Sequence, residues 1–206
     1  MRARADAICR EVASTYTKCA AAYASATRDY AGFPGLEGEL LSFLEWLPAG
    51  RVLDLGAGSG RDTEFAARHG YQVVAADIAV GMTQEIKRQM PKAAVVCCDA
   101  RRLPFRPSSF AGLIASGVLL HLPKDACGSA LREVKRVLIP AGLALVSMQA
   151  GEGEDWREGK SLVERRWFSL YRPEQFSRLC RGAGLSVEAV RPCSREDWYS
   201  LVLRPA

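Results

Sequence analysis

The sequence predicts an α/β fold: a doubly wound, three-layer αβα domain around a seven-stranded, mostly parallel sheet. Through the middle of the chain, apolar segments of strand length alternate with helical segments. This pattern is typical of a parallel sheet covered by helices on both faces. Further along, two apolar segments are joined by the four residues CSRE, and so short a connection permits only an antiparallel pair. We therefore expect a parallel sheet that ends in an antiparallel hairpin.

Residues 1–48 are predicted to form an N-terminal helical cap. Residues 4–28 are rich in Ala and contain no Gly or Pro, which favours a helix. In residues 36–47, LEGELLSFLEWL, the apolar side chains recur at helical spacing. The Pro-Ala-Gly that follows ends this second helix.

Residues 51–149 are predicted to form the core of the sheet and its helices. The predicted strands are residues 51–57, 72–77, 93–99, 110–117 and 142–149. The predicted helices between them are residues 61–69, 80–90 and 124–138.

Residues 150–206 are predicted to begin with a polar insertion, residues 150–172, followed by the last helix and the hairpin. The helix covers residues 173–183 and starts with Pro at its first position, where the missing N–H is harmless. The hairpin strands are residues 185–192 and 197–205. A chain of 206 residues fits this as a single domain.

Composition excludes several classes of protein. With 49% hydrophobic residues the chain can bury a core, and it has no run of eighteen apolar residues. Its charged first residues lack the apolar segment of a secretory signal, so we expect a cytoplasmic protein. The net charge of +5 comes from scattered arginines, which favours a mildly basic surface over a nucleic-acid site. The seven cysteines lack metal-ligand spacing, so we expect reduced thiols and no metal.

A glycine-rich loop follows the first predicted strand. The segment VLDLGAGSGRD, residues 52–62, carries glycines in the spacing G-x-G-x-G. Glycine in such a place indicates a sharp turn or a ligand close to the backbone. The dinucleotide fingerprint G-x-G-x-x-G and the Walker phosphate loop are both absent. The alternative is a strand-to-helix turn with spare glycines.

Two aspartates strengthen the ligand interpretation. Asp77 closes the second predicted strand and Asp99 the third. In a doubly wound sheet, ligands bind at the carboxyl ends of the strands, so both should face the crevice of the glycine loop. The first acid can accept hydrogen bonds from ribose hydroxyls, and the second can reach an adenine amine. Each could instead cap the following helix.

The chain resembles the class I S-adenosylmethionine-dependent methyltransferases, of the small-molecule type. The resemblance rests on the loop above and on VVAADIAVGM (73–82), VVCCDARRLPF (95–105), residues 117–148 and RPEQFSRLCRGAGLSVEAV (172–190). The pattern Y-x-x-x-A-x-x-Y, residues 16–23, resembles the family's N-terminal helix over the cofactor. Together these segments cover nearly all of residues 14–204.

The resemblance implies S-adenosylmethionine as cofactor, S-adenosylhomocysteine as product, and a set of site residues. Asp77 would bind the ribose, Asp99 and Ala100 the adenine, and Ser116 would face the reactive methyl. The full set of cofactor positions is Tyr16, Asp54, Gly56, Ala57, Gly58, Gly60, Asp62, Asp77, Ile78, Met82, Asp99, Ala100, Arg101, Ser116 and Gly117.

The resemblance also places the acceptor side of the site. His121, in the loop after the fourth core strand, is the candidate general base, although the family often carries H-L-P there for packing or orientation. The insertion 150–172 would wall the acceptor pocket, unless it is a lid strand with solvated arginines. The candidate acceptor-binding residues are Tyr23, His121, Arg165, Arg166, Trp167 and Tyr171.

There are departures from the family pattern. Ala111 stands where an Asp is common, and Ile139-Pro140-Ala141-Gly142 replaces K-P-G-G, both away from the cofactor. The fourth strand lacks an Asn/Asp-Pro-Pro-Tyr/Phe ending, which argues against amino-methylation of DNA bases, and no Pro-Cys follows it to support a cysteine-dependent attack on a pyrimidine carbon.

The function expected is methyl transfer to O or N of a small-molecule acceptor by in-line displacement, with no nucleic acid or membrane partner. Three alternatives stay open. One is an RNA or protein methyltransferase, although no recognition tail is evident. The second is a non-catalytic nucleotide-binding module. The third is a nicotinamide dehydrogenase, which the tighter glycine spacing disfavours. The sequence does not separate a monomer from a homodimer.

Overall fold

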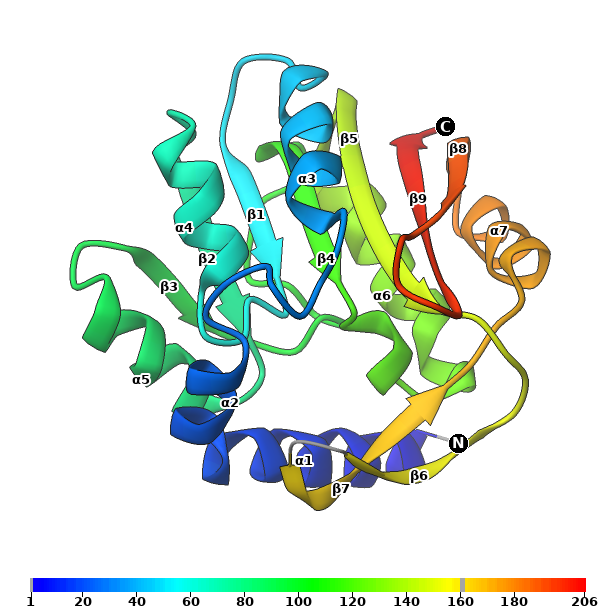
Figure 1. The fold of residues 1–206 in the computed structure, drawn as a ribbon. Helices are drawn as coiled ribbons and strands as arrows, with labels where there is room; N and C mark the ends of the chain where they lie inside the picture. Colours follow the sequence, from blue (N-terminus) through cyan, green and yellow to red (C-terminus); the bar gives the residue numbers. More distant parts are fainter. Residues whose placement is uncertain (1, 160–161) are drawn as a thin grey trace.

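The computed structural model describes residues 2–159 and 162–206. A seven-stranded sheet with the order β3-β2-β1-β4-β5-β9-β8 forms the centre of the molecule (Figure 1). Its strands are β1 Val52–Leu55, β2 Val73–Asp77, β3 Ala94–Cys97, β4 Phe110–Ser116, β5 Leu138–Gln149, β8 Leu185–Pro192 and β9 Trp198–Pro205.

The direction of the strands confirms the predicted fold class. The pairs from β3 to β5 are all parallel, whereas β9 is antiparallel to both β5 and β8. The chain moves outward from β1 to β3 and then returns to place β4 on the other side of β1. This reversal opens a crevice at the carboxyl ends of β1 and β4, where doubly wound folds bind ligands.

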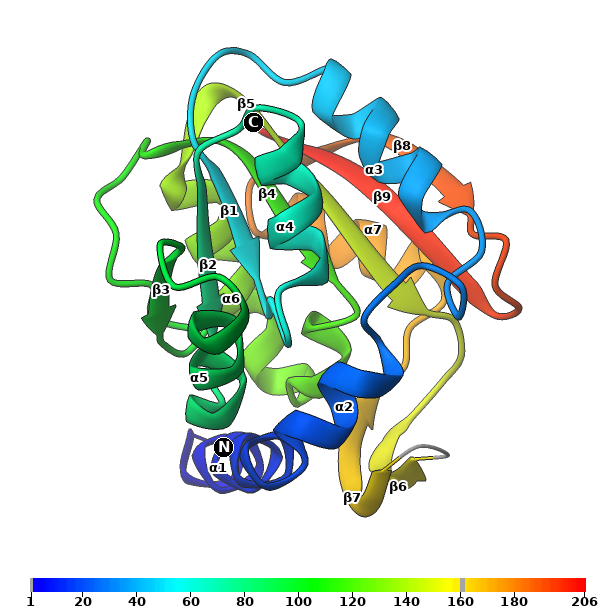
Figure 2. The same ribbon diagram turned by 60° about the vertical axis from the view of Figure 1, so that its left-hand side comes forward.

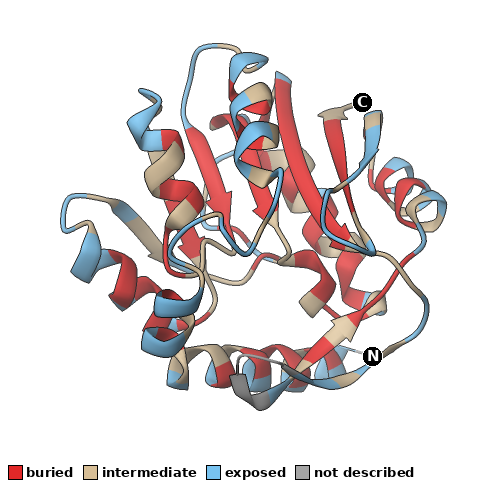
Figure 3. Cartoon of the chain, in the orientation of Figure 1, coloured by how far each residue is buried: buried red, intermediate tan, exposed pale blue. Residues whose placement is uncertain are grey.

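Helices cover both faces of the sheet, and the strands between them are largely buried (Figures 2 and 3). On one face, α3 (Leu36–Glu45) and α4 (Arg61–Arg68) contribute Leu40, Phe43 and Ala66 to a core with Val52. On the other face, α6 (Lys124–Val137) and α7 (Pro173–Gly182) pack on β1, β4 and β5. Helix α5 (Val80–Gln89) lies along β2 and β3.

The fifth core strand begins earlier than predicted. Strand β5 begins at Leu138, directly after α6, rather than at residue 142. The extra residues include Pro140, which lies between the pairs Phe110–Leu138 and Gly112–Leu143, where the ladder shifts register. A proline costs nothing there because no ladder hydrogen bond needs its missing N–H.

The cap lies across the carboxyl ends of the parallel strands. It consists of α1 (Arg2–Lys18), α2 (Ala20–Ala26) and a hairpin of β6 (Glu154–Gly159) and β7 (Leu162–Ser169) (Figure 1). The helix predicted over residues 4–28 is thus divided at Cys19, whose backbone leaves the helical conformation at φ −96° and ψ 10°. The turn allows both helices to contact α5.

Helix α1 is held to the hairpin by a small apolar cluster. Ile8 and Val12 of α1 pack against the buried ring of Trp167 on β7, with Tyr16 and Trp156 at the edge. Because side chains alternate along a strand, Arg166 and Phe168 point to the opposite side of β7 from Trp167. In the described part of the chain, no helix is long and apolar enough to cross a membrane.

Candidate functional site

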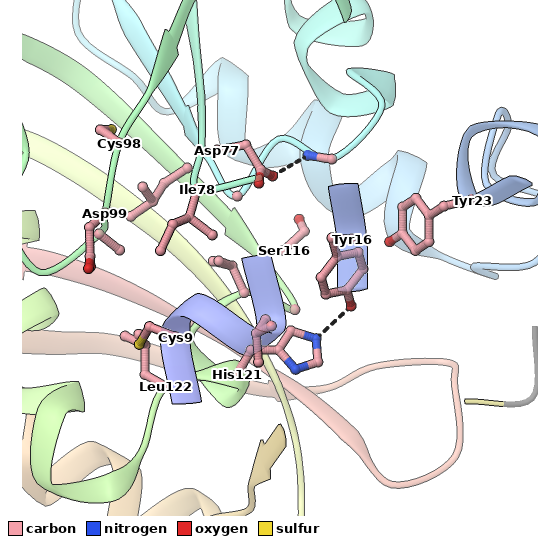
Figure 4. Close-up of a pocket in the computed structure, with 17 residues that line it drawn as sticks. Cys9, Tyr16, Tyr23, Asp77, Ile78, Cys98, Asp99, Ser116, His121 and Leu122 are labelled. Carbon is pink, nitrogen blue, oxygen red and sulfur yellow. Dashed lines mark hydrogen bonds between the residues drawn. The ribbon is translucent and has the colours of Figure 1, made fainter. Parts of the chain in front are cut away.

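A cavity lies between the carboxyl ends of the parallel strands and the cap. It encloses about 710 Å³ of space, part of it open to solvent. Figure 4 shows its lining side chains converging from the strand ends and from the cap. The lining includes eleven of the residues that the sequence predicts for the site: Tyr16, Tyr23, Gly56, Gly58, Asp77, Ile78, Asp99, Ala100, Ser116, Gly117 and His121.

Six lining residues were not predicted. They are Cys9, Val12, Leu55, Cys98, Val118 and Leu122. All are apolar or thiol side chains that complete the wall between α1 and the strand ends. Their residue types are those of any buried surface, so no sequence signal separates them from core residues.

The glycine loop and Asp77 form one hydrogen-bonded unit. Gly56 and Gly58 have φ angles of +70° and +55°, a backbone region that glycine adopts without strain. Gly58 N–H donates to Asp77 Oδ2 over 2.9 Å, and Ala79 N–H donates to Asp77 Oδ1 over 2.8 Å. Burial raises the pKa of Asp77 to about 6, although the hydrogen bonds from these backbone donors lower it. The carboxylate is thereby fixed at the edge of the cavity, with acceptor capacity left for a ligand.

Asp99 lies at the far end of the cavity and is held by an arginine. Arg101 Nη2 contacts Asp99 Oδ2 at 2.6 Å, and the Arg101 N–H donates to Asp99 Oδ1 over 2.9 Å. Arg101 also pairs with Asp6 of α1 at 2.9 Å. Arg101 does not line the cavity itself; it joins the third strand end to the cap.

The floor of the cavity is formed by the end of β4. Ser116 Oγ is buried and has no hydrogen-bond partner among the described residues, although it lines the cavity. Gly117 follows with φ +65°, and a Cβ there would lie 3.2 Å from the Trp198 ring. A side chain at Gly117 would therefore press on Trp198. Ser116 offers the cavity an unpaired hydroxyl.

Six of the predicted cofactor residues lie outside the lining. Asp54 alternates with Leu53 and Leu55 along β1, so its side chain points away from the cavity, and its Oδ2 accepts from Thr63 Oγ1 over 2.5 Å. Burial, with the charge of Asp62, raises the pKa of Asp54 to about 7. The six are Asp54, Ala57, Gly60, Asp62, Arg101 and Met82. Met82 is buried in a small cluster with Ala20 and Ala79.

Asp62 belongs to a separate buried group beside the loop. It accepts from Tyr30 Oη over 3.0 Å and from Arg61 Nε over 2.8 Å. The Arg61 guanidinium lies 4.1 Å from the centre of the Phe33 ring. This group ties the segment between α2 and α3 to the start of α4.

His121 is the centre of a hydrogen-bonded chain at the edge of the cavity. Its Nδ1 lies 2.6 Å from the Trp167 carbonyl oxygen, which can only accept, so Nδ1 carries the proton. Its Nε2 lies 2.9 Å from Tyr16 Oη (Figure 4). Burial lowers the pKa of His121 to about 4, so the ring is neutral and Nε2 accepts the Tyr16 proton. Arg166 Nη1 donates to Tyr16 Oη over 3.3 Å.

The other predicted acceptor residues take different places in the insertion. Arg165 is exposed and pairs with Glu11 at 3.1 Å. Trp167 contributes its backbone carbonyl, while its ring packs against α1. Tyr171 is buried in the core beside Phe176. None of these residues lines the cavity: Arg165, Arg166, Trp167 and Tyr171 all lie outside it. Among the described contacts of these four, the side chain of Arg166 is the one that donates a hydrogen bond to a lining side chain, that of Tyr16.

Comparison with known proteins gives one family match. Residues 52–142 match the family model described as a methyltransferase domain. The matched residues run from β1 into β5, and they include the glycine loop, Asp77, Asp99 and His121.

Two curated relatives extend this finding. Over 143 residues, which make up 67% of this chain, the sequence is 38% identical to the biotin biosynthesis bifunctional protein BioHC of Cellvibrio japonicus. Over 100 residues, which make up 48% of this chain, it is 40% identical to the demethylmenaquinone methyltransferase of Beutenbergia cavernae. The matches span only 27% and 41% of the length of these relatives.

A solved structure shares the fold. The 1,6-didemethyltoxoflavin-N1-methyltransferase of Burkholderia thailandensis matches with a TM-score of 0.75 at 21% identity, over 94% of this chain and 87% of that chain. At this identity the likeness shows the fold.

Proposed function

We propose that this chain, whose residues 52–142 match a methyltransferase domain, is a class I, Rossmann-like S-adenosylmethionine-dependent methyltransferase that transfers a methyl group to an oxygen or nitrogen of a small-molecule acceptor. The observation that carries the proposal is a single cavity lined by the glycine loop, both strand-end carboxylates and the paired Tyr16 and His121. The two curated relatives are named for roles in menaquinone and biotin biosynthesis, which supports a small-molecule acceptor.

The lining residues fit S-adenosylmethionine. Asp77 keeps free acceptor positions for the ribose hydroxyls, and Ile78 and Ala100 offer an apolar slot for the adenine beside Asp99. The unpartnered Ser116 Oγ and the bare backbone of Gly56 and Gly58 would hold the polar amino-acid end. When bound, the cofactor supplies a methyl group on a sulfonium sulfur, which an acceptor displaces to leave S-adenosylhomocysteine.

The protein's own contribution is positioning and closure. Holding the acceptor in line can supply on the order of 7–11 kcal/mol of the barrier, so a strong base is not essential. The cap contributes Cys9, Val12, Tyr16 and Tyr23 to the cavity lining, opposite the strand ends.

His121 acts in this proposal through Tyr16. As the acceptor gives its proton to Tyr16 Oη, the phenol proton moves to His121 Nε2, and Nδ1–H stays on the Trp167 carbonyl. Burial and the nearby Arg166 both lower the pKa of His121, to about 4, so it is a weak base. It can therefore take a proton only from a group that methylation has made acidic.

The test is release of S-adenosylhomocysteine across a panel of candidate small molecules. We expect turnover with a subset of hydroxyl- or amine-bearing acceptors, and none without acceptor. His121→Ala should lower kcat while the cofactor affinity changes little. Turnover equal to the unsubstituted protein would make His121 a packing residue. Turnover only with RNA or protein would replace the small-molecule proposal.

A further inference from the structure

Two arginines near the cavity have no carboxylate partner among the residues that the structure describes. Several other arginines near the cap are paired: Arg4 with Glu154, Arg61 with Asp62, Arg101 with Asp99 and Asp6, and Arg165 with Glu11. Within residues 2–159 and 162–206, Arg166 and Arg195 form no ion pair with any described carboxylate. Guanidinium groups that are partly removed from water ordinarily acquire an anionic partner.

Arg166 is held in place by aromatic rings. Its guanidinium lies 5.3 Å from the centre of the Phe168 ring and 5.9 Å from that of Tyr16, and Nη1 donates to Tyr16 Oη. Its Nε is buried and has no hydrogen-bond partner among the described residues. The side chain is thus oriented beside Tyr16 with a buried donor left unused, which costs free energy unless a ligand accepts from it.

Arg195 is an exposed residue in the turn between β8 and β9. Its guanidinium lies 4.5 Å from the centre of the Trp198 ring, and that ring covers Gly117 of the cavity. Burial lowers the pKa of Arg195, and Arg166 lowers it further. The neighbouring Glu196 and Asp197 are exposed and do not offset this.

Tyr23 links the two arginines to the cavity. Its ring meets that of Tyr16 edge-on at 5.5 Å and lines the cavity beside Gly58. Burial raises the pKa of Tyr23, while Arg61 and Arg166 oppose the rise, and Tyr23 in turn acts on Arg195. Both guanidinium groups thus act electrostatically with the same phenol, and neither forms an ion pair with a carboxylate among the described residues.

Resting on the function proposed above, we propose that the methyl acceptor carries an anionic oxygen group, a carboxylate or phosphate, that binds between Arg166 and Arg195. A planar guanidinium offers paired N–H donors that match such a group. The anion would satisfy the buried Nε of Arg166 and relieve the repulsion between the two arginines. It would also place the rest of the acceptor next to Tyr16 and His121.

The test uses small probes rather than the acceptor. Benzoate, its neutral counterpart benzamide and inorganic phosphate are titrated into the full chain, with and without S-adenosylhomocysteine, while Trp fluorescence is followed because Trp198 lies under Arg195. We expect benzoate or phosphate to bind at least about 10-fold more tightly than benzamide. Tighter binding of phosphate than of benzoate would assign the group as a phosphate.

Variants locate the anion. Arg166→Gln and Arg195→Gln should each weaken binding of the anionic probe about 10- to 100-fold. Arg181→Gln, which removes an equal charge from the exposed surface of α7, should change it less than twofold. Arg166→Lys keeps the charge but lacks the paired N–H donors of a guanidinium, so its loss of affinity for the anionic probe should be intermediate. Unchanged melting temperature and S-adenosylhomocysteine affinity in these variants show that fold and cofactor site are intact.

Two outcomes overturn this inference. One is equal binding of benzoate and benzamide to the unsubstituted protein. The other is an equal loss in Arg181→Gln and Arg166→Gln. Failure of the proposed function is distinct: S-adenosylhomocysteine would then not bind to any form of the protein, whatever the anionic probes do.

Discussion

Asp77 illustrates how a single residue is prepared for a ligand. Both carboxylate oxygens are fixed by backbone N–H groups, one from the glycine loop and one from the start of α5. Because the carboxylate is buried, its pKa rises to about 6. Two consequences follow at the scale of this residue, one for affinity and one for pH.

Removing the Asp77 side chain should weaken binding of S-adenosylhomocysteine. Hydrogen bonds to a charged group contribute about 1.5–3 kcal/mol, so Asp77→Ala should raise the Kd roughly 10- to 150-fold in a calorimetric titration. Glu85→Gln on α5 serves as the control, because Glu85 pairs with Arg88 and does not line the cavity. An unchanged Kd in Asp77→Ala would remove this residue from the cofactor site.

Affinity for S-adenosylhomocysteine should also depend on pH through Asp77. Above its pKa of about 6 the carboxylate is ionised and accepts hydrogen bonds, while below it one oxygen carries a proton. The Kd should therefore rise as the pH falls from about 7.5 to about 5, and this rise should flatten in Asp77→Asn. A Kd with the same pH dependence in both proteins would contradict the assignment.

His121 should make folding stability depend on pH. Its pKa is lowered from 6.5 to about 4 by burial, so between these values the unfolded chain binds more protons than the folded one. The contribution of neutral His121 to the free energy of unfolding is complete above pH 6.5 and is lost as the pH falls toward 4. The total loss is about 3 kcal/mol at most.

Denaturant unfolding of the unsubstituted protein and His121→Gln between pH 4 and 8 measures this loss. Both proteins have the same carboxylates, so the contribution of these groups cancels when one free energy of unfolding is subtracted from the other. The difference in free energy of unfolding should shrink as the pH falls below about 6.5. A difference that stays constant with pH would show that His121 titrates equally in both states.

At the scale of elements, the cap determines which side chains reach the cavity. On β7 the buried Trp167 ring faces α1, so Arg165 pairs with Glu11 of α1 while Arg166 faces Tyr16. On β1 the same alternation points Leu55 into the cavity wall and Asp54 toward Thr63. A shift of either strand by one residue would exchange these roles.

Loosening the cap should expose α1 without melting the sheet. Trp167→Ala removes the ring that Ile8 and Val12 cover, a change that typically costs about 3–5 kcal/mol in a packed cluster. We expect faster amide hydrogen exchange in residues 2–18 and β7, with β1 and β4 still protected. Trp46→Ala, at a tryptophan that is 48% exposed, is the matched control. Equal loss of protection throughout the sheet would contradict an independently opening cap.

The alternation along strands also explains what the sequence could predict of the site. Asp77 and Asp99 each end an apolar run, and the carboxyl ends of neighbouring parallel strands meet at one edge, so their convergence followed from the pattern alone. The contacts of Arg166 did not follow, because they depend on how β7 pairs and on which of its faces meets α1. Arg195 was missed because a turn residue carries no periodic signal.

At the scale of the whole molecule, the order of the strands places the cavity. The reversal between β1 and β4 leaves their carboxyl ends without a crossing helix, and the cap covers this opening. The alternation of apolar and helical segments predicted this topology, since consecutive parallel strands require helical crossovers. The break at Cys19 was not predictable, because the Ala-rich sequence on either side of it is helical by propensity alone.

The central claim is that this cavity binds S-adenosylmethionine, and a calorimetric titration tests it most directly. Titration of S-adenosylhomocysteine and of NAD into separate samples of the full chain, at pH 7.5, compares the two ligands under the same conditions. The account predicts one-site binding of S-adenosylhomocysteine in the micromolar range and no heat from NAD. Saturable binding of NAD with none of S-adenosylhomocysteine would contradict it.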